Sequence, residues 1–443
     1  MKLFGSSGIR GVYGEKITAD LALNLGRALG TLGMSDVVVA HDTRLSQTVL
    51  KTSLFGGLLS AGCSVTDLHT APTPLICYGT RRLGKDAGVM ITASHNPAEY
   101  NGFKLWNSEG RAFSAGQETQ IESTIGSGRY KQVGWNEVDV EINEYDIGPD
   151  YAEDILDRFS LKGKSRVLID AANGAACGIS PLLLEKFGYD VVSVNATSDG
   201  GFPNRHPEPS PVNLGKTVEI MRRKKCQIGF CHDGDADRVM TIDDTGTVVD
   251  YDHFLAYICR KMVELTGIRK VVTTVDASML LDVCLPDAEV IRTPVGDVFV
   301  ANKLEEAGAC FGGEPCGAYI FPEFGLWPDG IYSIFRILQF LETEKEPLSK
   351  ILSRMPDIEF KRSKLPCPEG RKAGVMEEIR SLVPEDCTFS DVDGIRMDWG
   401  DSLVLIRPSG TQPIMRINAE ARTRERLNSL MSRWNAIVRE AIR

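Results

Sequence analysis

The chain has 443 residues, of which 42% are hydrophobic and 25% charged, a balance typical of a globular protein. Its formal net charge of -10 argues against binding nucleic acid or anionic membrane through a broad basic surface. The 11 cysteines include no Cys-x-x-Cys pair, so we expect no zinc or redox motif and favour a cytoplasmic protein. Neither a secretory signal nor an apolar run of ~18 residues is visible, so no membrane partner is expected.

The first part of the chain predicts alternating helices and strands. Apolar residues recur at helical spacing after Thr18, a plausible N-cap, and a second helix is expected over residues 46–61. Residues 37–40 form a short apolar run of the buried-strand type. The polar stretch 110–150, rich in glycine and serine in places, predicts a domain boundary.

The remaining chain predicts two further α/β units and a smaller α+β unit. Strands are expected over 166–170, 190–194, 227–231, 271–275 and 288–291, with a helix over 218–225. The last unit ends in an amphipathic helix whose apolar face is predicted to be core: Leu427, Leu430, Met431, Trp434, Ile437 and Val438. We therefore predict domains over residues 1–148, 149–250, 251–356 and 357–443.

Three alternating aspartates, Asp233, Asp235 and Asp237, follow a predicted strand and could surround one point if their loop curls. Hard divalent cations prefer oxygen ligands, and Mg²⁺ commonly leaves positions for phosphate oxygens. The alternative of an EF-hand fails, because Arg238 and Asp244 stand where glycine and glutamate are required. A solvated acidic turn remains the other interpretation.

A reactive hydroxyl is predicted at Ser94. Residues 92–97 read Thr-Ala-Ser-His-Asn-Pro and follow an apolar run, so Ser94 is expected at the carboxyl end of a strand, where open α/β sheets bind ligands. A serine hydroxyl needs activation, whereas a phosphoserine is a good phosphoryl donor once cations neutralise it. Arg10 and Lys104 are candidate cations, and an ordinary turn is the competing interpretation of the motif.

Two further loops carry polar groups suited to a sugar phosphate. Glu314, in a glycine-rich turn, could accept hydrogen bonds from sugar hydroxyls, or could be a surface acid on a hairpin. Residues 407–411 read Arg-Pro-Ser-Gly-Thr and offer a guanidinium, two hydroxyls and backbone N–H groups to a phosphate, or form a plain turn. We assign no base role to His95 or His232.

At these four motifs the chain resembles the α-D-phosphohexomutases, which include phosphoglucomutase, phosphomannomutase and phosphoglucosamine mutase. The resemblance extends over the whole length, because the motifs occur in the family's order. It implies three similar α/β domains and a smaller C-terminal α+β domain around a central cleft. It also implies a phosphoserine at Ser94 and Mg²⁺ bound by the Ser94 phosphate, Asp233, Asp235 and Asp237.

The resemblance implies further roles in binding and catalysis. Arg10 and Lys104 would be cationic helpers, with Lys104 assisting proton transfer, and Arg238 would lie near the metal loop. The distal phosphate would be held by Arg407, Ser409, Gly410 and Thr411. Phosphoserine would give its phosphoryl group to the substrate, and the bisphosphorylated sugar would turn round and return its other phosphate. Hexose 1,6-bisphosphate would thus be intermediate and activator, in a cytoplasmic monomer or homodimer acting on a small phosphosugar.

Two departures bear on the substrate. Many relatives have serine and histidine in the Glu314 loop, where this chain has Cys316 and Ala318. Asp297 follows Thr-Pro-Val-Gly, and phosphoglucosamine mutases often have aspartate at the corresponding position of a similar loop. Asp297 could pair with a substrate ammonium. These residues favour phosphoglucosamine mutase over phosphomannomutase or phosphoglucomutase. More distant alternatives are a phosphatase using the aspartates and a non-catalytic sugar-phosphate binding protein.

Overall fold

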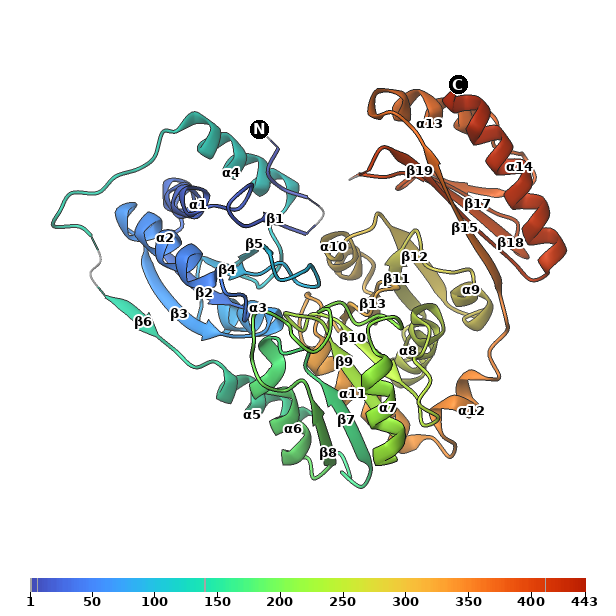
Figure 1. Ribbon diagram of the computed structural model, residues 1–443, viewed down its shortest axis with the longest axis horizontal. Helices are drawn as coiled ribbons and strands as arrows, with labels where there is room; N and C mark the ends of the chain where they lie inside the picture. The colour runs from blue at the N-terminus through green and yellow to red at the C-terminus, as the bar shows by residue number, and fades with distance from the viewer. Residues whose placement is uncertain (1, 6, 139–140, 411) are drawn as a thin grey trace.

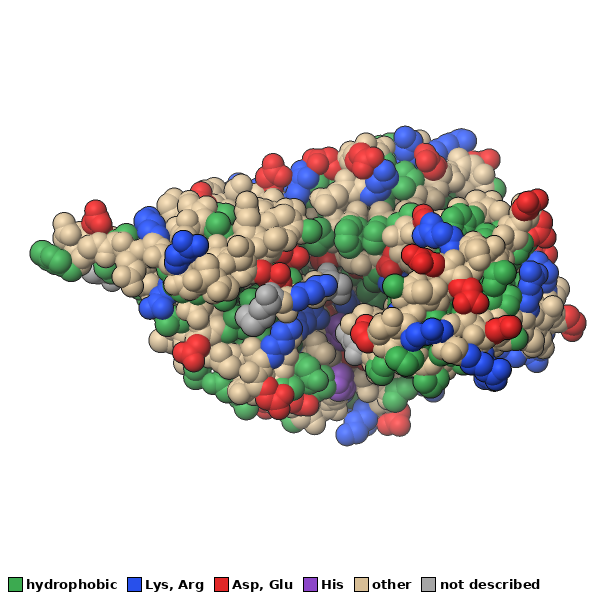
Figure 2. All heavy atoms as spheres, turned by 90° about the horizontal axis from the view of Figure 1, so that it is seen from above, with side chains coloured by type: hydrophobic (Ala, Val, Ile, Leu, Met, Phe, Trp, Pro, Cys, Tyr) green, Lys and Arg blue, Asp and Glu red, His purple; other side chains and the backbone are tan. Residues whose placement is uncertain are grey.

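A computed structural model describes residues 2–5, 7–138, 141–410 and 412–443 of the chain. Four β-sheets follow one another along the described chain, each with its own helices (Figure 1). The first sheet lies at one side, the second and third meet in the middle, and the fourth lies at the opposite side, beside the C-terminus. Seen from above, the molecule is hollowed at its centre, and Lys, Arg and His side chains lie inside the hollow (Figure 2).

The first sheet has the strand order β1-β5-β4-β2-β3-β6. Its strands are β1 (Ile9–Val12), β2 (Asp36–His41), β3 (Ser64–Thr70), β4 (Ala87–Ile91), β5 (Tyr100–Asn107) and β6 (Ile142–Glu144). Its helices are α1 (Ala19–Thr31), α2 (Gln47–Ser60), α3 (Thr73–Arg82) and α4 (Ala115–Ser127). Thr18 caps α1 as predicted, because its side chain accepts a hydrogen bond from the backbone N–H of Leu21.

The stretch 110–150, where a domain boundary is predicted, also contains regular structure of the first domain. Ser114 and Gln117 form a capping box that starts α4, a helix that packs against α1. Strand β6 pairs with β3 at the edge of the first sheet. The polar composition of the stretch reflects exposure, since Ile121 is the one fully buried side chain among the described residues of α4.

The second and third sheets share one topology, β8-β7-β9-β10 and β12-β11-β13-β14. The second domain contains α5 (Gly148–Arg158), β7 (Arg166–Asp170), α6 (Ser180–Lys186), β8 (Asp190–Val194), α7 (Gly215–Lys224), β9 (Ile228–His232) and β10 (Val239–Ile242). The third contains α8 (Tyr251–Thr266), β11 (Lys270–Thr274), α9 (Leu280–Cys284), β12 (Glu289–Thr293), α10 (Asp297–Ala307), β13 (Phe311–Gly313), β14 (Tyr319–Ile320), α11 (Gly330–Thr343) and α12 (Leu348–Leu352).

The same four-strand unit recurs in all three α/β domains. In each, three parallel strands are followed by one antiparallel strand, and the first sheet adds β1 and β6 to the unit β3-β2-β4-β5. The parallel pairs β7–β8 and β7–β9, and then β11–β12 and β11–β13, repeat this pattern. This repetition, which is not visible as a sequence repeat, confirms the expectation of three similar α/β domains.

The fourth domain is an antiparallel sheet of order β15-β19-β18-β17-β16 covered by two helices. It contains β15 (Glu359–Pro366), α13 (Lys372–Ser381), β16 (Thr388–Ser390), β17 (Ile395–Asp398), β18 (Ser402–Pro408), β19 (Ile414–Ala421) and α14 (Arg424–Ile442). The predicted apolar face of α14 is buried against this sheet, with only Ile437 partly exposed. The fold class is therefore α/β with a C-terminal α+β domain, as predicted.

One hydrophobic core joins the first three domains, whereas the fourth has its own. Tyr151 of α5 is central to the shared core, since its ring lies 5.4 Å from that of Tyr78 and 5.6 Å from that of Phe324. A small cluster that includes Val275 and Leu405 connects the third domain to the fourth. No helix in the described part of the chain is long and apolar enough to cross a membrane.

Candidate active site

The three repeated domains contribute equivalent loops to one place. Ser94 follows β4, Asp233 follows β9 and Glu314 follows β13, and each of these is the strand that borders the antiparallel strand of its sheet. The loop after β9 lies between the other two. The backbone N–H of Val239 donates to the Gly317 carbonyl at 3.0 Å, and that of Thr73 donates to the Asp235 carbonyl at 2.9 Å.

Ser94 is fully buried and directly faces the acidic loop. Its hydroxyl donates to Asp233 Oδ2 over 2.7 Å and lies 3.3 Å from His95 Nδ1. Its backbone has a φ of 51°, a left-handed conformation that is costly for a non-glycine residue. Burial lowers the pKa of His95 to about 2, so this imidazole is neutral beside the hydroxyl.

The loops of Ser94 and Asp233 approach each other so closely that one position between them requires glycine. A Cβ atom added at Gly234 would lie 2.6 Å from the Ser94 carbonyl oxygen, closer than real contacts allow. The hydroxyl and the carboxylates are therefore brought together by backbone contact between two domains.

A buried arginine that the motif analysis did not select holds the Ser94 loop. Arg44 donates to the carbonyl oxygens of Ser94 and Asn96, at 2.8 and 2.7 Å. It also donates to those of Pro97 and Tyr100, at 2.5 and 2.9 Å. Its Nε atom pairs with Asp42 Oδ2 at 3.0 Å, and both side chains are fully buried. The sequence signal that could have identified Arg44 is the Asp-x-Arg pattern directly after a predicted strand.

The three aspartates do surround one point, as predicted. Carboxylate oxygens of Asp233, Asp235 and Asp237 lie within 4.8 Å of one another, and all three residues are buried. Burial, together with the two neighbouring carboxylates, raises the pKa of Asp233 well above its ordinary value. A solvated acidic turn is thereby excluded, because a buried acidic cluster needs cationic compensation.

Lys104 supplies part of that compensation. Its ammonium donates to Asp235 Oδ2 at 2.8 Å and to Asp237 Oδ2 at 2.6 Å. Burial alone would raise the pKa of Asp235, but Lys104 outweighs it and holds that pKa below its ordinary value. Burial alone would lower the pKa of Lys104, but the two aspartates outweigh it and raise that pKa. Thr73, which the motif analysis missed, donates from its hydroxyl to Asp235 Oδ2 at 2.6 Å.

The residues fit a hard divalent cation. Asp235 Oδ1 and Asp237 Oδ1 are buried and have no hydrogen-bond partner among the described residues, so each offers a free oxygen to an ion. Ser94 Oγ adjoins this site, because it donates a hydrogen bond to Asp233 Oδ2. Lys104 pairs with Asp235 and Asp237, and a divalent cation would offset the burial and the carboxylate repulsion that raise the pKa of Asp233.

Arg10 and Arg238 add positive charge around the acidic cluster. Arg10 lies near Asp235, Asp237 and Asp297, and burial lowers the pKa of its guanidinium. The Nε atom of Arg10 is buried without a hydrogen-bond partner among the described residues. Arg238 lies 3.9 Å from Asp237, near the metal loop, where the family resemblance implies that it should be.

Two acids border the acidic cluster on the side of the third domain. Glu314 accepts from the backbone N–H of Gly296 at 3.2 Å, which holds it beside the loop that begins α10 with Asp297. Burial, and then the nearby Asp297, raises the pKa of Glu314 to about 8. Burial also raises the pKa of Asp297, and it raises the pKa of the Cys316 thiol to about 12. Cys316 is therefore a neutral thiol in this loop.

The predicted phosphate loop lies in the fourth domain, apart from the other three. Arg407 is 25% exposed and contacts Asp393 and Asp276, and Ser409 is buried at 5% exposure. Lys372, which no sequence signal indicated, donates to the carbonyls of Ser409 and Gln412 and so orders this loop. Gly410 is exposed, and Thr411 lies outside the described residues. Among the described residues, no hydrogen bond or ion pair joins this loop to Ser94 or to the aspartates.

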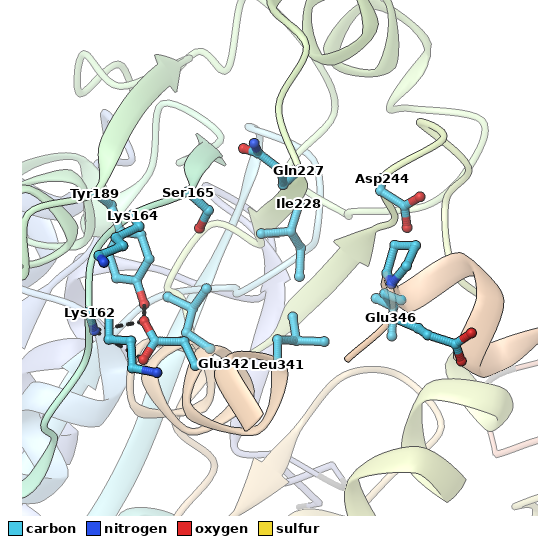
Figure 3. Close-up of a pocket in the computed structure, with 13 residues that line it drawn as sticks. Lys162, Lys164, Ser165, Tyr189, Gln227, Ile228, Asp244, Leu341, Glu342 and Glu346 are labelled. Carbon is cyan, nitrogen blue, oxygen red and sulfur yellow. Dashed lines mark hydrogen bonds between the residues drawn. The ribbon is translucent and has the colours of Figure 1, made fainter. Parts of the chain in front are cut away.

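A separate hollow of about 360 Å³ lies between β9 and α11 and contains none of these residues (Figure 3). In this hollow Glu342 accepts from the Tyr189 hydroxyl at 2.9 Å and from the Lys162 backbone N–H at 2.8 Å. It therefore adds nothing to the chemistry of the site.

Comparison with known proteins identifies the family. Profiles of the phosphoglucomutase/phosphomannomutase family match domain I at residues 1–132, domain II at 149–246, domain III at 250–358 and the C-terminal domain at 363–436. The chain belongs to this family. The resemblance drawn from the four motifs is thereby confirmed, and the protein is a phosphohexomutase, an isomerase that acts by phosphoryl transfer.

Individual relatives agree over the full length of this phosphohexomutase. Probable phosphoglucosamine mutases of Methanothermobacter thermautotrophicus and Thermococcus kodakarensis are 44% and 42% identical to it. Both matches cover 100% of this chain, and 98% and 99% of the relatives. A crystal structure of a phosphoglucomutase/phosphomannomutase family protein from Burkholderia thailandensis matches with a TM-score of 0.89 at 28% identity, covering 99% of this chain and 97% of that one.

Proposed function

We propose that this phosphohexomutase interconverts glucosamine 6-phosphate and glucosamine 1-phosphate through a phosphorylated Ser94 and a bisphosphorylated sugar. The observation that carries the substrate assignment is the pair of carboxylates from Glu314 and Asp297, placed on adjoining loops beside the acidic cluster. A sugar ammonium between them would offset the burial that raises the pKa of both acids and the repulsion by Asp297 that adds to it at Glu314. The names of the relatives from Methanothermobacter thermautotrophicus and Thermococcus kodakarensis support the same substrate.

The composition of the Glu314 loop supports an amino sugar over a neutral hexose. Cys316 is a weak donor and Ala318 has no polar side chain, so this loop offers few hydrogen bonds to neutral hydroxyls. A charged amino group gains more from two carboxylates than a hydroxyl would, because charge-assisted hydrogen bonds are the stronger kind. Asp297 and Glu314 would therefore select the substrate by charge.

The proposed chemistry follows from the contacts of Ser94 and Lys104. In the first half-reaction, the bond between Ser94 Oγ and phosphorus breaks while a sugar oxygen bonds to the phosphorus. Lys104, which is protonated between Asp235 and Asp237, would donate a proton to Ser94 Oγ, and the proton of the sugar hydroxyl would replace it. Mg²⁺ held by Asp233, Asp235 and Asp237 would neutralise phosphate charge.

The second half-reaction reverses the first with the other phosphate of the sugar. The bisphosphate would turn round while Arg407, Ser409, Gly410 and Thr411 hold whichever phosphate is distal to Ser94. The fourth domain has its own core and contacts the third domain through a small hydrophobic cluster. A movement of the fourth domain would therefore admit both orientations of the sugar bisphosphate. Hexose 1,6-bisphosphate would also phosphorylate an enzyme that has lost its Ser94 phosphate.

The test is a coupled assay of isomer interconversion with the phosphates of glucosamine, glucose and mannose, together with the mass of the Ser94 peptide. We expect the highest kcat/KM with glucosamine phosphate, a phosphoryl mass on that peptide, and no turnover in Ser94→Ala. Higher kcat/KM with glucose or mannose phosphate would overturn the substrate assignment. Full activity without a phosphoryl group, or phosphate release without interconversion, would overturn the mechanism in favour of the aspartate-based phosphatase.

A further inference from the structure

Arg407, the proposed phosphate anchor, is held by two acids from different domains. Its Nη2 atom lies 2.5 Å from Oδ2 of Asp393, in the turn before β17, and its Nη1 atom lies 3.7 Å from Oδ2 of Asp276, after β11. The three side chains are between 25% and 29% exposed. The guanidinium is thus already paired with anions when no phosphate is bound to it.

The contact with Asp393 depends on the next residue. Gly394 has a φ of 90°, and a Cβ atom there would lie 2.3 Å from Arg407 Cγ and 2.5 Å from the Ile406 carbonyl oxygen. The turn therefore lies directly against Arg407. The same Asp393 oxygen accepts from the backbone N–H of Val295 at 3.1 Å, which connects the fourth domain to the loop carrying Asp297.

Aspartates near the ends of the corresponding strands in the other two α/β domains differ from Asp276 in their pairing. Asp42 follows β2 and Asp170 ends β7, the strands that correspond to β11 in the repeated unit. Both are fully buried and pair with arginines of their own domains, Asp42 with Arg44 and Asp170 with Arg205, each at 3.0 Å. Those pairs are buried parts of the scaffold.

Asp276 departs from this pattern in exposure, in partner and in distance. It is 29% exposed, its arginine belongs to another domain, and the two lie 3.7 Å apart. The Thr274 hydroxyl donates to its Oδ1 at 2.6 Å and keeps Oδ2 facing Arg407. Such a solvated pair across two domains exchanges partners at low cost.

We propose that Asp393 and Asp276 are placeholder residues, which occupy Arg407 whenever the distal phosphate of the sugar is absent. The inference rests on the proposed function, in which the bisphosphate must leave Arg407, turn round and rebind. Without the two carboxylates, the departing phosphate would leave a partly buried guanidinium unpaired, and that costs free energy. The placeholders weaken the binding of phosphate and speed its departure.

The two acids are thus positioning residues, and their removal is expected to increase the affinity for phosphate rather than decrease it. Asparagine has the same shape and still accepts from Val295, but it does not compete electrostatically for Arg407. We expect Asp393→Asn to bind phosphate about threefold to tenfold more tightly, the effect of about one partly screened charge pair. We expect kcat for sugar-phosphate interconversion to fall by a similar factor, because the intermediate leaves Arg407 more slowly.

The experiment uses the full chain and two probes, inorganic phosphate and glucosamine 6-phosphate, titrated calorimetrically in a Ser94→Ala background that prevents turnover. Asp393→Asn, Asp276→Asn and the double variant are compared with Asp391→Asn. Asp391 pairs with Arg380 on the exposed surface of the same domain and serves as the matched control. Steady-state kcat and KM are then measured with Ser94 intact.

Tighter binding of both probes with a lower kcat, largest in the double variant and absent in the control, is the expected result. A merely structural role predicts the opposite, because a loosened Arg407 binds phosphate more weakly and raises KM. Unchanged or weaker affinity in variants with wild-type circular dichroism overturns the proposal. The phosphate titration requires no turnover, so it separates failure of the placeholders from failure of the proposed mutase activity.

Discussion

Arg44 offers a sharp test of how the Ser94 loop is held. All five of its N–H groups are used: Nε pairs with Asp42, and the two terminal nitrogens donate to the carbonyls of Ser94, Asn96, Pro97 and Tyr100. Lysine carries the same charge but only three donors, so Arg44→Lys removes at least two of these five hydrogen bonds. Each lost hydrogen bond costs about 0.5–1.5 kcal/mol net, which predicts a loss of about 1–3 kcal/mol in stability.

The loss of activity should exceed what unfolding explains. The carbonyl of Ser94 is one of the atoms that Arg44 holds, and a displacement of about 1 Å in a reacting group can cost a factor of about 10² in rate. We expect kcat of Arg44→Lys to fall about 100-fold at a temperature where circular dichroism shows it folded. Arg129→Lys, an exposed arginine of the same domain, is the matched control and should match the wild type.

A double variant separates the ion pair from the clamping of the loop. Arg44→Met leaves the buried Asp42 carboxylate without its cation, and burial already raises the pKa of Asp42. Adding Asp42→Asn should restore about 2 kcal/mol of stability, because it removes that uncompensated charge, but should not restore kcat. Urea unfolding and the coupled assay measure the two effects. Wild-type kcat in Arg44→Lys, or recovery of kcat in the double variant, would refute the reasoning.

Two further predictions concern the neighbouring loops. The pKa of Glu314, about 8 against an ordinary 4.5, means that the folded protein keeps a proton that the unfolded chain loses, so stability falls as pH rises from 6 to 8. Glu314→Gln should remove about 2 kcal/mol of that fall in urea unfolding, whereas the exposed Glu185→Gln should not, and parallel curves for all three proteins would contradict the shift. Gly234→Ala should reduce kcat at least tenfold, because the added methyl group would meet the Ser94 carbonyl. Gly215→Ala is the control and should be neutral, since a Cβ atom at Gly215 has no neighbour within 4 Å. Equal activity of the two variants would disprove the close approach at Gly234.

Sequence reasoning found the Ser94 and Asp233 loops because each follows a short apolar strand. Glu314 was predicted from its glycine-rich turn, and the structure adds that Ser94, Asp233 and Glu314 all follow equivalent strands. Local spacing could also predict that Asp235 and Asp237 lie together, since alternating residues in a tight turn face one point. These inferences needed only information within about ten residues of each motif.

The remaining parts of the site depend on contacts distant in sequence. Thr73 reaches Asp235 across 162 residues, and Lys372 orders the phosphate loop across 37. Neither position has a local pattern that distinguishes it from an ordinary helical residue. The pairing of Arg407 with Asp276 likewise depends on how the fourth domain packs on the third. Such partners follow from tertiary packing and not from local spacing.

The hydrophobic core shared by the first three domains dictates when the newly made chain can fold. The cluster beneath the first sheet is complete once Ile121 has been made, so that part can collapse early on the ribosome. The shared core also needs Trp327 and residues up to Met355. Tyr151 and its neighbours therefore remain exposed to solvent during synthesis of the next two hundred or so residues. A translational pause before Trp327 would prolong that exposure and increase the demand for chaperones, whereas a pause within the fourth domain would not.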